Sequence, residues 1–117
     1  MPLHIFSKSP VEAEHYLLAP EKLLAGNPKQ SVWMQYTDPT KKFFVGVWQS
    51  EVGKWKIDYT EEEYCQIQEG TSIITEASGP SFSVTAGDSF VIPRGFVGTW
   101  EVVTSTRKSF VIYEPGE

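Results

Sequence analysis

The chain has little of what disulfide, zinc and nucleic-acid sites require. Its single cysteine, Cys65, excludes an internal disulfide and a zinc site made of several cysteines. The net charge is −5, and the only adjacent basic pairs are Lys41-Lys42 and Arg107-Lys108. Because a phosphate backbone selects clustered lysine and arginine, we expect no nucleic-acid partner.

Long apolar runs are missing as well. In the first twenty residues Glu12, Glu14 and His15 interrupt every apolar stretch. A signal peptide or a membrane span needs such a stretch, so we expect neither. We therefore expect a soluble cytoplasmic protein without a membrane partner.

What the chain does contain is aromatic residues and turn signals. With 117 residues, 14% of them aromatic, it is predicted to form one domain whose modest core carries bulky rings. Residues 1–30 are interrupted by Pro2, Pro10, Pro20 and Pro28 and are predicted to form an N-terminal arm packed outside that domain. Within the arm, residues 20–26 have proline at their start and glycine at their end, which is typical of a short helical turn.

Residues 31–117 show the pattern of an all-β domain. Short apolar or alternating segments are separated by Gly, Pro, Asp and Ser turns, and no long helical period occurs. Because closure of a sheet removes its exposed edges, we predict a small β-barrel of jelly-roll type. The expected strands are 32–36, 43–49, 54–59, 63–68, 71–76, 82–85, 89–92, 98–103 and 108–113.

The segment from Gly87 to Gly95, G-D-S-F-V-I-P-R-G, is the most informative motif. Pro93 cannot donate to a strand ladder and Gly95 readily turns, so a strand must end there. The segment resembles the second signature of the cupin family. The first cupin signature is matched as well, because six residues separate Glu63 from Gly70. Over about residues 45–113 the chain resembles a small single-domain cupin of the ureidoglycine aminohydrolase cupin domain group.

The resemblance implies a cupin barrel but not the metal chemistry that is usual in the family. Metal-binding cupins take two histidines and a glutamate from the first signature and a third histidine from the second. Here the histidine positions hold Ile57, Tyr59 and Gly98, so only Glu63 is retained. We therefore predict no metal and no cofactor, and do not carry over the aminohydrolase activity. A remodelled metal site using Glu61, Glu63 and water remains the alternative.

Strand alternation predicts which side chains face the barrel interior. Lys54, Lys56 and Asp58 share one face of their strand, so the other face must point inward. On the next strand Glu63 shares a face with Cys65, where a carboxylate needs a partner or water. The predicted interior pocket is framed by Trp55, Tyr59, Glu63, Cys65 and Trp100.

Roles follow from these positions. Glu63 and Tyr59 are the candidate catalytic residues, and Trp55 and Trp100 are candidate walls for a substrate, although packing in the core is the alternative for both. Cys65 joins them as a substrate-binding candidate and, alternatively, as a small buried hydrophobe.

Two basic residues complete the set of candidate substrate-binding residues. Arg94 lies in the Pro-x-Gly corner and Lys108 on the last strand. Either could neutralise Glu63 or bind an anionic substrate, and a surface position is the alternative for each.

Three functions remain open at this point. The first is a small-molecule-binding cupin, with or without activity on a polar metabolite such as an amide, ureide or sugar derivative. The second is a non-catalytic ligand-sensing or accessory cupin, and the third is a metal-dependent cupin with a carboxylate-rich site. We also expect a homodimer, because residues 32–36 form an apolar strand that would otherwise be an exposed edge.

Overall fold

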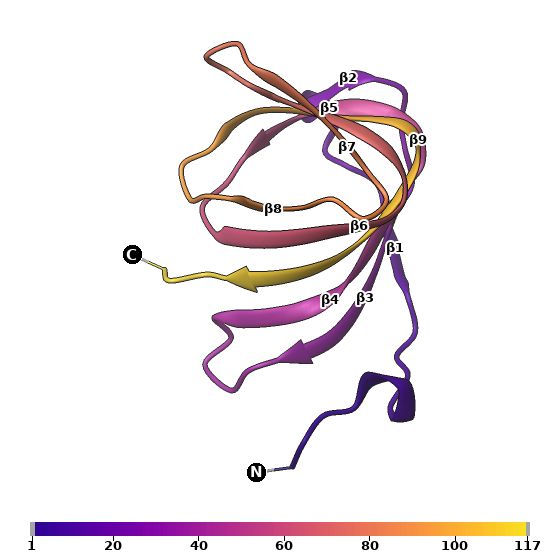
Figure 1. Ribbon diagram of the computed structural model, residues 1–117, viewed down its shortest axis with the longest axis vertical. Coiled ribbons are helices and arrows are strands. Elements are labelled where there is room, and N and C mark those ends of the chain that lie inside the picture. Colours follow the sequence, from indigo (N-terminus) through magenta and orange to yellow (C-terminus); the bar gives the residue numbers. More distant parts are fainter. Residues whose placement is uncertain (1, 117) are drawn as a thin grey trace.

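The computed structural model describes residues 2–116, which form one strongly bent antiparallel sheet (Figure 1). Within these residues the helical segments are two three-residue 3-10 turns, η1 (Phe6–Lys8) and η2 (Pro20–Lys22). The strands are β1 (Glu14–Tyr16), β2 (Leu23–Ala25), β3 (Gln30–Thr37), β4 (Phe43–Ser50), β5 (Gly53–Asp58), β6 (Glu62–Glu76), β7 (Ser81–Thr85), β8 (Ser89–Ile92) and β9 (Val97–Tyr113).

The two long strands β6 and β9 organise the sheet. They pair along almost their whole length, from Glu62 opposite Tyr113 to Glu76 opposite Gly98. The other edge of β9 pairs with β4 and β5, and the other edge of β6 pairs with β8 and β7. Each long strand therefore runs through both halves of the molecule, and the bend brings the two halves face to face (Figure 1).

The bend lies where the ladder between β6 and β9 shifts register, between Ile67 and Ser72. Gly70 takes a φ of 82° at this point, and a Cβ atom there would run into the backbone of Ser105. Only glycine combines a positive φ with so close an approach. The glycine of the first cupin signature thus has a structural role at the fold of the sheet.

The core fills the space between the two halves. It is dominated by three tryptophans, with Trp48 in edge-to-face contact with both Trp55 (centroids 6.1 Å apart) and Trp100 (5.5 Å apart). Such aromatic pairs stabilise a core beyond the area they bury. The remaining buried members of this cluster are Cys65, Ile67, Ile74, Val84, Ile92, Val102 and Phe110.

The predicted all-β jelly-roll fold is confirmed, with two differences in detail. Four expected strands are really two, because residues 63–68 and 71–76 lie in β6, and 98–103 and 108–113 lie in β9. The expected helical turn at residues 20–26 is a 3-10 turn followed by β2.

The N-terminal segment also differs from the predicted arm outside the barrel. β1 pairs with β3 and β2 pairs with β5, so part of residues 1–30 extends the sheet. The physical reason is that the edges of β3 and β5 offer unpaired backbone groups, which these short segments satisfy. Among residues 2–116 no helix is long and apolar enough to cross a membrane.

Candidate functional site

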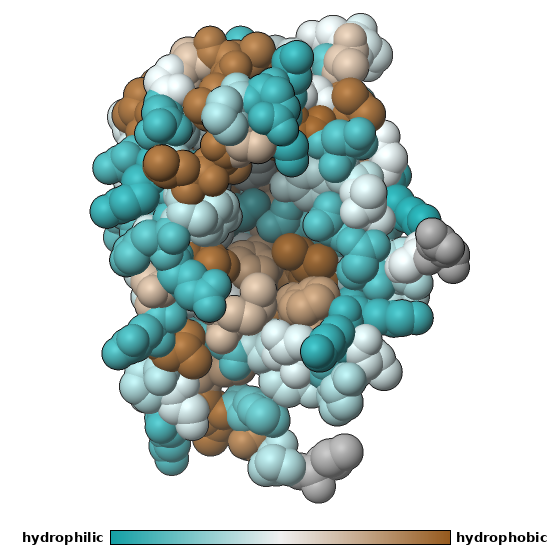
Figure 2. All heavy atoms as spheres, turned by 180° about the vertical axis from the view of Figure 1, so that it is seen from behind, coloured by the Kyte–Doolittle hydropathy of each residue, from teal (hydrophilic) through white to brown (hydrophobic). Residues whose placement is uncertain are grey.

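A cavity of about 420 Å³ opens between the two halves of the sheet, and we call it the cup. Its walls come from the N-terminal segment and from β3, β4, β5, β6 and β9. The molecular surface in Figure 2 is hollowed near its centre, where apolar side chains are surrounded by hydrophilic ones. The residues that matter for the argument below are Gln30, Trp48, Trp55, Tyr59, Glu63, Trp100 and Lys108, all of which line the cup.

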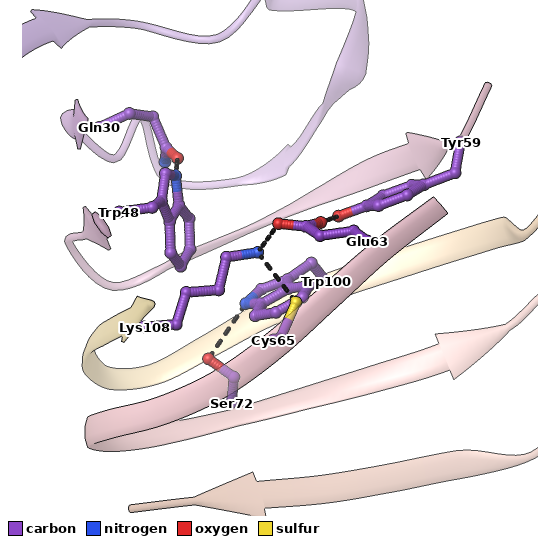
Figure 3. A network of polar contacts seen from close by, with 8 residues as sticks. All are labelled: Gln30, Trp48, Tyr59, Glu63, Cys65, Ser72, Trp100 and Lys108. Atoms are coloured by element: carbon purple, nitrogen blue, oxygen red, sulfur yellow. Dashed lines mark hydrogen bonds and ion pairs between the residues drawn. The ribbon is translucent and has the colours of Figure 1, made fainter. Parts of the chain in front are cut away.

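A buried ion pair lies at the base of the cup (Figure 3). Lys108 Nζ of β9 is 2.9 Å from Glu63 Oε2 of β6, and both side chains are about 95% removed from solvent, at 6% and 5% exposure. The hydroxyl of Tyr59 donates to the other carboxylate oxygen, Glu63 Oε1, at 2.6 Å. Lys108 Nζ also lies 3.5 Å from Cys65 Sγ. A buried carboxylate is stable only when it is paired and hydrogen-bonded, and Glu63 is both.

Two indole rings flank the ammonium group of Lys108. Its Nζ atom is 4.8 Å from the ring centroid of Trp48 and 4.5 Å from that of Trp100. Both distances are within the range of cation–π attraction, which is strongest for tryptophan and for desolvated cations. Figure 3 shows the lysine side chain extending between the rings toward Glu63.

The indole rings are themselves held by hydrogen bonds. Trp48 Nε1 donates to Gln30 Oε1 at 2.7 Å, and Gln30 Nε2 donates to Ser50 Oγ at 2.6 Å. Trp100 Nε1 donates to Ser72 Oγ at 3.0 Å. Among residues 2–116 every buried polar side-chain atom has a partner. The Trp48 and Trp100 walls of the cup are therefore fixed by polar contacts behind them.

Protonation states follow from burial and charge. Burial raises the pKa of the Cys65 thiol to about 12 and holds the pKa of the Tyr59 hydroxyl well above its usual 10. Burial works against the charge of Lys108, but the acidic groups Cys65, Glu63 and Tyr59 around it more than offset this and raise its pKa. At neutral pH the side chains of Cys65, Tyr59 and Lys108, which surround Glu63 at the base of the cup, therefore carry their protons.

The structure brings most of the predicted site residues together. Trp55, Tyr59, Glu63, Trp100 and Lys108 line the cup, and Cys65 is fully buried beside Lys108.

Arg94 lies elsewhere, contrary to the prediction. Its guanidinium donates to the carbonyl oxygen of Gly116 at 2.9 Å, and its backbone N–H contacts the Glu62 carboxylate. The physical reason is that the Pro-x-Gly corner turns the residue out to solvent, whereas the alternation of β9 turns Lys108 inward. The cation that neutralises Glu63 is Lys108.

Trp48 and Gln30 were not predicted as site residues. Trp48 alternates with Gly46 and Ser50 along β4, and this inward face could have been recognised in the sequence. Gln30 precedes the expected strand and is polar, so no sequence pattern marks it as a buried residue.

The side chains of the cup do not fit a transition metal. A divalent ion prefers imidazole, thiolate or several carboxylates, whereas at the base of the cup one carboxylate, Glu63, and one protonated thiol lie beside an ammonium group. Glu61 also lines the cup but forms no group of three metal-ligating side chains with them. Gly98, at the third histidine position, does not line the cup. A Cβ atom at this position would also meet the backbone of Thr75. His15 donates to or accepts from Ser31, and His4 packs on Tyr36. Among residues 2–116 no group of three metal-ligating side chains occurs.

Comparison with known proteins gives a family and several structural neighbours. The family model described as EutQ-like cupin domain matches residues 37–110. A DUF861 family protein of Thermotoga maritima is 30% identical, with a TM-score of 0.54, over 55% of this chain and 73% of that one. No curated protein matches.

Two further solved structures share the fold at lower identity. A DUF861 family protein of unknown function from Pseudomonas syringae pv. tomato has a TM-score of 0.80 and 18% identity over 88% of this chain. This chain spans only 45% of that protein's length. The Clostridium difficile EutQ protein has a TM-score of 0.62 and 18% identity, over 73% of this chain and 64% of that one. Identities this low concern the fold alone.

Proposed function

We propose that this chain, which belongs to the EutQ-like cupin domain family, binds a small polar metabolite in its cup. The observation that carries the proposal is the cavity of about 420 Å³ with the Glu63–Lys108 ion pair and Tyr59 at its base. Ligand sites are typically apolar cavities with a few convergent polar groups, and the aromatic walls of the cup fit this description.

The charge of the cup favours a neutral ligand. Glu63 and Lys108 compensate each other, so a ligand with a net charge would leave that charge unpaired in a desolvated site. A neutral ligand that presents an acceptor and a donor side by side can use Lys108 and Glu63 together. Amides and ureides have this arrangement, and so do the vicinal hydroxyls of sugar derivatives.

The same groups support proton transfer on such a ligand. Glu63 is the carboxylate at the base of the cup and can accept a proton, while Lys108 and Tyr59 carry protons and can stabilise charge that develops on a ligand oxygen. In this proposal Glu63 is the base, and Tyr59 and Lys108 are the donors.

A second candidate is ligand binding without catalysis, as in a sensing or accessory module. It is favoured by the fact that both oxygens of Glu63 already accept bonds, from Tyr59 and from Lys108. A carboxylate tied on both sides is a weaker base, because hydrogen bonds to the charged form stabilise it.

The test is a thermal-shift screen of the purified protein with amides, ureides and sugar derivatives. A ligand present at a hundred times its Kd should stabilise the folded state by about 2.7 kcal/mol and raise the Tm accordingly. The same ligand should raise the Tm of the Glu63→Gln and Tyr59→Phe variants only slightly.

Two matched controls lie on β6. Glu69→Gln and Tyr64→Phe make the same chemical changes at exposed positions, so both variants should respond like the wild type. Equal shifts in all five proteins would contradict binding in the cup. Turnover of the ligand, followed by product analysis, would separate the enzyme from the sensor.

A further inference from the structure

The ammonium group of Lys108 lies in surroundings that resemble a binding site for a cation. Its Nζ atom is 2.9 Å from a carboxylate oxygen of Glu63, 3.5 Å from the sulfur of Cys65, and less than 5 Å from the faces of Trp48 and Trp100. Oxygen, sulfur and π faces are all electron-rich, and together they surround the ammonium (Figure 3). Among residues 2–116 the pair of Lys108 and Glu63 is the one ion pair in the structure.

The sheet holds this cation in place. Lys108 pairs with Trp48 of β4 on one side and with Ile67 of β6 on the other, so its backbone is in the middle of the sheet. Its whole side chain is buried, at 4% residue exposure. Lys108 is therefore fixed at its backbone by the sheet and buried along its side chain, unlike a surface lysine on a flexible stem.

We propose that the Lys108 ammonium is the resident cation of the cup, occupying the place that a metal ion would need, and that it receives a carbonyl oxygen of the bound ligand. The first half stands on the geometry of the protein alone. The second half rests on the proposed function, because it concerns the ligand of the same site.

The Lys108 ammonium and a metal ion cannot occupy this position at the same time. A zinc ion bound to Glu63 and Cys65 would lie at about 2.0–2.3 Å from their oxygen and sulfur atoms. The Nζ atom already lies between these two atoms, at 2.9 and 3.5 Å. A second cation there would overlap the first and be repelled by it. Lys108 has three N–H donors, and Glu63 and Cys65 account for two of them, which leaves one for a ligand oxygen that enters the cup.

The first test is titration with Co²⁺ and Zn²⁺, monitored by the absorption of a cobalt–thiolate bond and by elemental analysis. The wild type should bind neither ion at micromolar concentration. Lys108→His replaces the ammonium by an imidazole beside the carboxylate and the thiol, and should take up one ion per chain. The double variant Lys108→His/Glu63→Gln should lose most of that binding.

Each outcome bears on the proposal. One metal ion per chain in the wild type, lost in Glu63→Gln, would overturn it without reference to any Lys108 variant. A folded Lys108→His protein that binds no metal would also overturn it, because the surroundings of Nζ would then not be a cation site. Circular dichroism and tryptophan fluorescence report the fold of each variant, and the wild-type arm decides the question if Lys108→His does not fold.

The second test applies to a carbonyl ligand identified by the thermal-shift screen. Its carbonyl, labelled with ¹³C, should show a lower infrared stretching frequency when bound than in water, because a cation in a desolvated site polarises the bond more strongly. An unshifted or raised frequency would overturn the second half of the proposal, that Lys108 receives a carbonyl oxygen of the ligand. It would not contradict ligand binding itself. Failure of every ligand in the screen would instead count against the proposed function and leave the metal test unaffected.

Discussion

Two opposite charges, Glu63 and Lys108, lie in a part of the molecule that water barely reaches. A buried pair of this kind adds little net stability compared with apolar side chains, because desolvation of two charges opposes their attraction. Removing one partner is different, since it leaves the other charge buried and alone. The intact pair is therefore not in itself a source of stability.

Replacing Lys108 by methionine should destabilise the protein by about 3–5 kcal/mol, because Glu63 is left as an uncompensated buried carboxylate. Glu63→Gln/Lys108→Met should recover most of that loss, since it removes both charges at similar volume. Urea denaturation at neutral pH measures both. Lys56→Met, at an exposed position on β5, is the control and should cost less than about 1 kcal/mol. A double variant as unstable as Lys108→Met would contradict this explanation.

The inward direction of these residues could be predicted, and their partners only in part. Trp55, Glu63 and Trp100 face the cup as strand alternation predicts. Lys108 alternates with Phe110 and Ile112, which lie on the cup side of β9, so the same pattern marks it as buried. The distance between Glu63 and Lys108 was not predictable, because the register of β6 against β9 is set by the whole sheet.

At the scale of elements, turns and bends decide how the strands reach the cup. The sequence predicts a strand break near Gly70 because glycine is an interruption in a strand pattern. In the structure the strand continues through this point, since Gly70 bends β6 without ending it. Whether a glycine ends a strand or bends it depends on the partner strand, here β9, and this information is not local.

Gly70→Ala should therefore be much more destabilising than a matched glycine substitution. Gly70 and Gly87 both take positive φ, of 82° and 96°. Gly87 has open space where a Cβ atom would be, so Gly87→Ala should cost only the backbone strain, about 1–2 kcal/mol. At Gly70 the new methyl group would meet the backbone of Ser105, adding about 1–3 kcal/mol of overpacking. Equal losses in urea denaturation would show that the close approach at the bend is unimportant.

The turn between β3 and β4 gives a prediction about pH. The Asp38 carboxylate accepts hydrogen bonds from the Thr40 hydroxyl and from the backbone N–H groups of Phe43 and Lys42, and these lower the pKa of Asp38 to about 2. Since this pKa is below the unfolded value of about 3.9, the turn stabilises the protein at pH values above about 4. The contribution is lost as the pH falls through about 2.

Urea denaturation of the wild type and Asp38→Ala between pH 6 and pH 2.5 checks this. The stability difference should be constant down to about pH 5 and should shrink below about pH 4. Thr40→Val, which removes the strongest of the donors, should show a smaller difference with the same pH dependence. A difference that does not change across this range would contradict the assignment.

At the scale of the whole molecule, the open edges of the sheet are the surface at which a second chain could pair. β1 covers β3 only as far as Val32, so within residues 2–116 the rest of this edge, residues 33–37, has no strand beside it. Met34 on this edge is 39% exposed. An uncovered apolar edge strand is a template for pairing with another chain, and the sequence led us to expect a homodimer through it.

Light scattering at micromolar concentration should therefore give a mass close to two chains. Met34→Lys should shift the protein toward one chain, because a lysine on an edge strand opposes pairing. Val91→Lys changes an exposed apolar residue on β8 in the same way and should leave the dimer intact. A wild-type mass close to one chain would argue against this interface.

The overall architecture was the most predictable level, because nine strand signals and two cupin signatures agree on one fold class. The N-terminal segment was less predictable, since three-residue strands such as β1 and β2 carry too few residues to show alternation. Their role in the sheet is set by the edges they cover.

The most direct test of the cup is a crystal structure of the protein with the ligand that raises its Tm most. The ligand should occupy the cavity of about 420 Å³, with a carbonyl or hydroxyl oxygen in hydrogen-bond contact with Lys108 Nζ and a donor group facing Glu63. Electron density for the ligand in another hollow, such as the one of about 500 Å³ lined by Phe82, Phe90 and Phe96, with the Glu63–Lys108 pair untouched, would contradict the account.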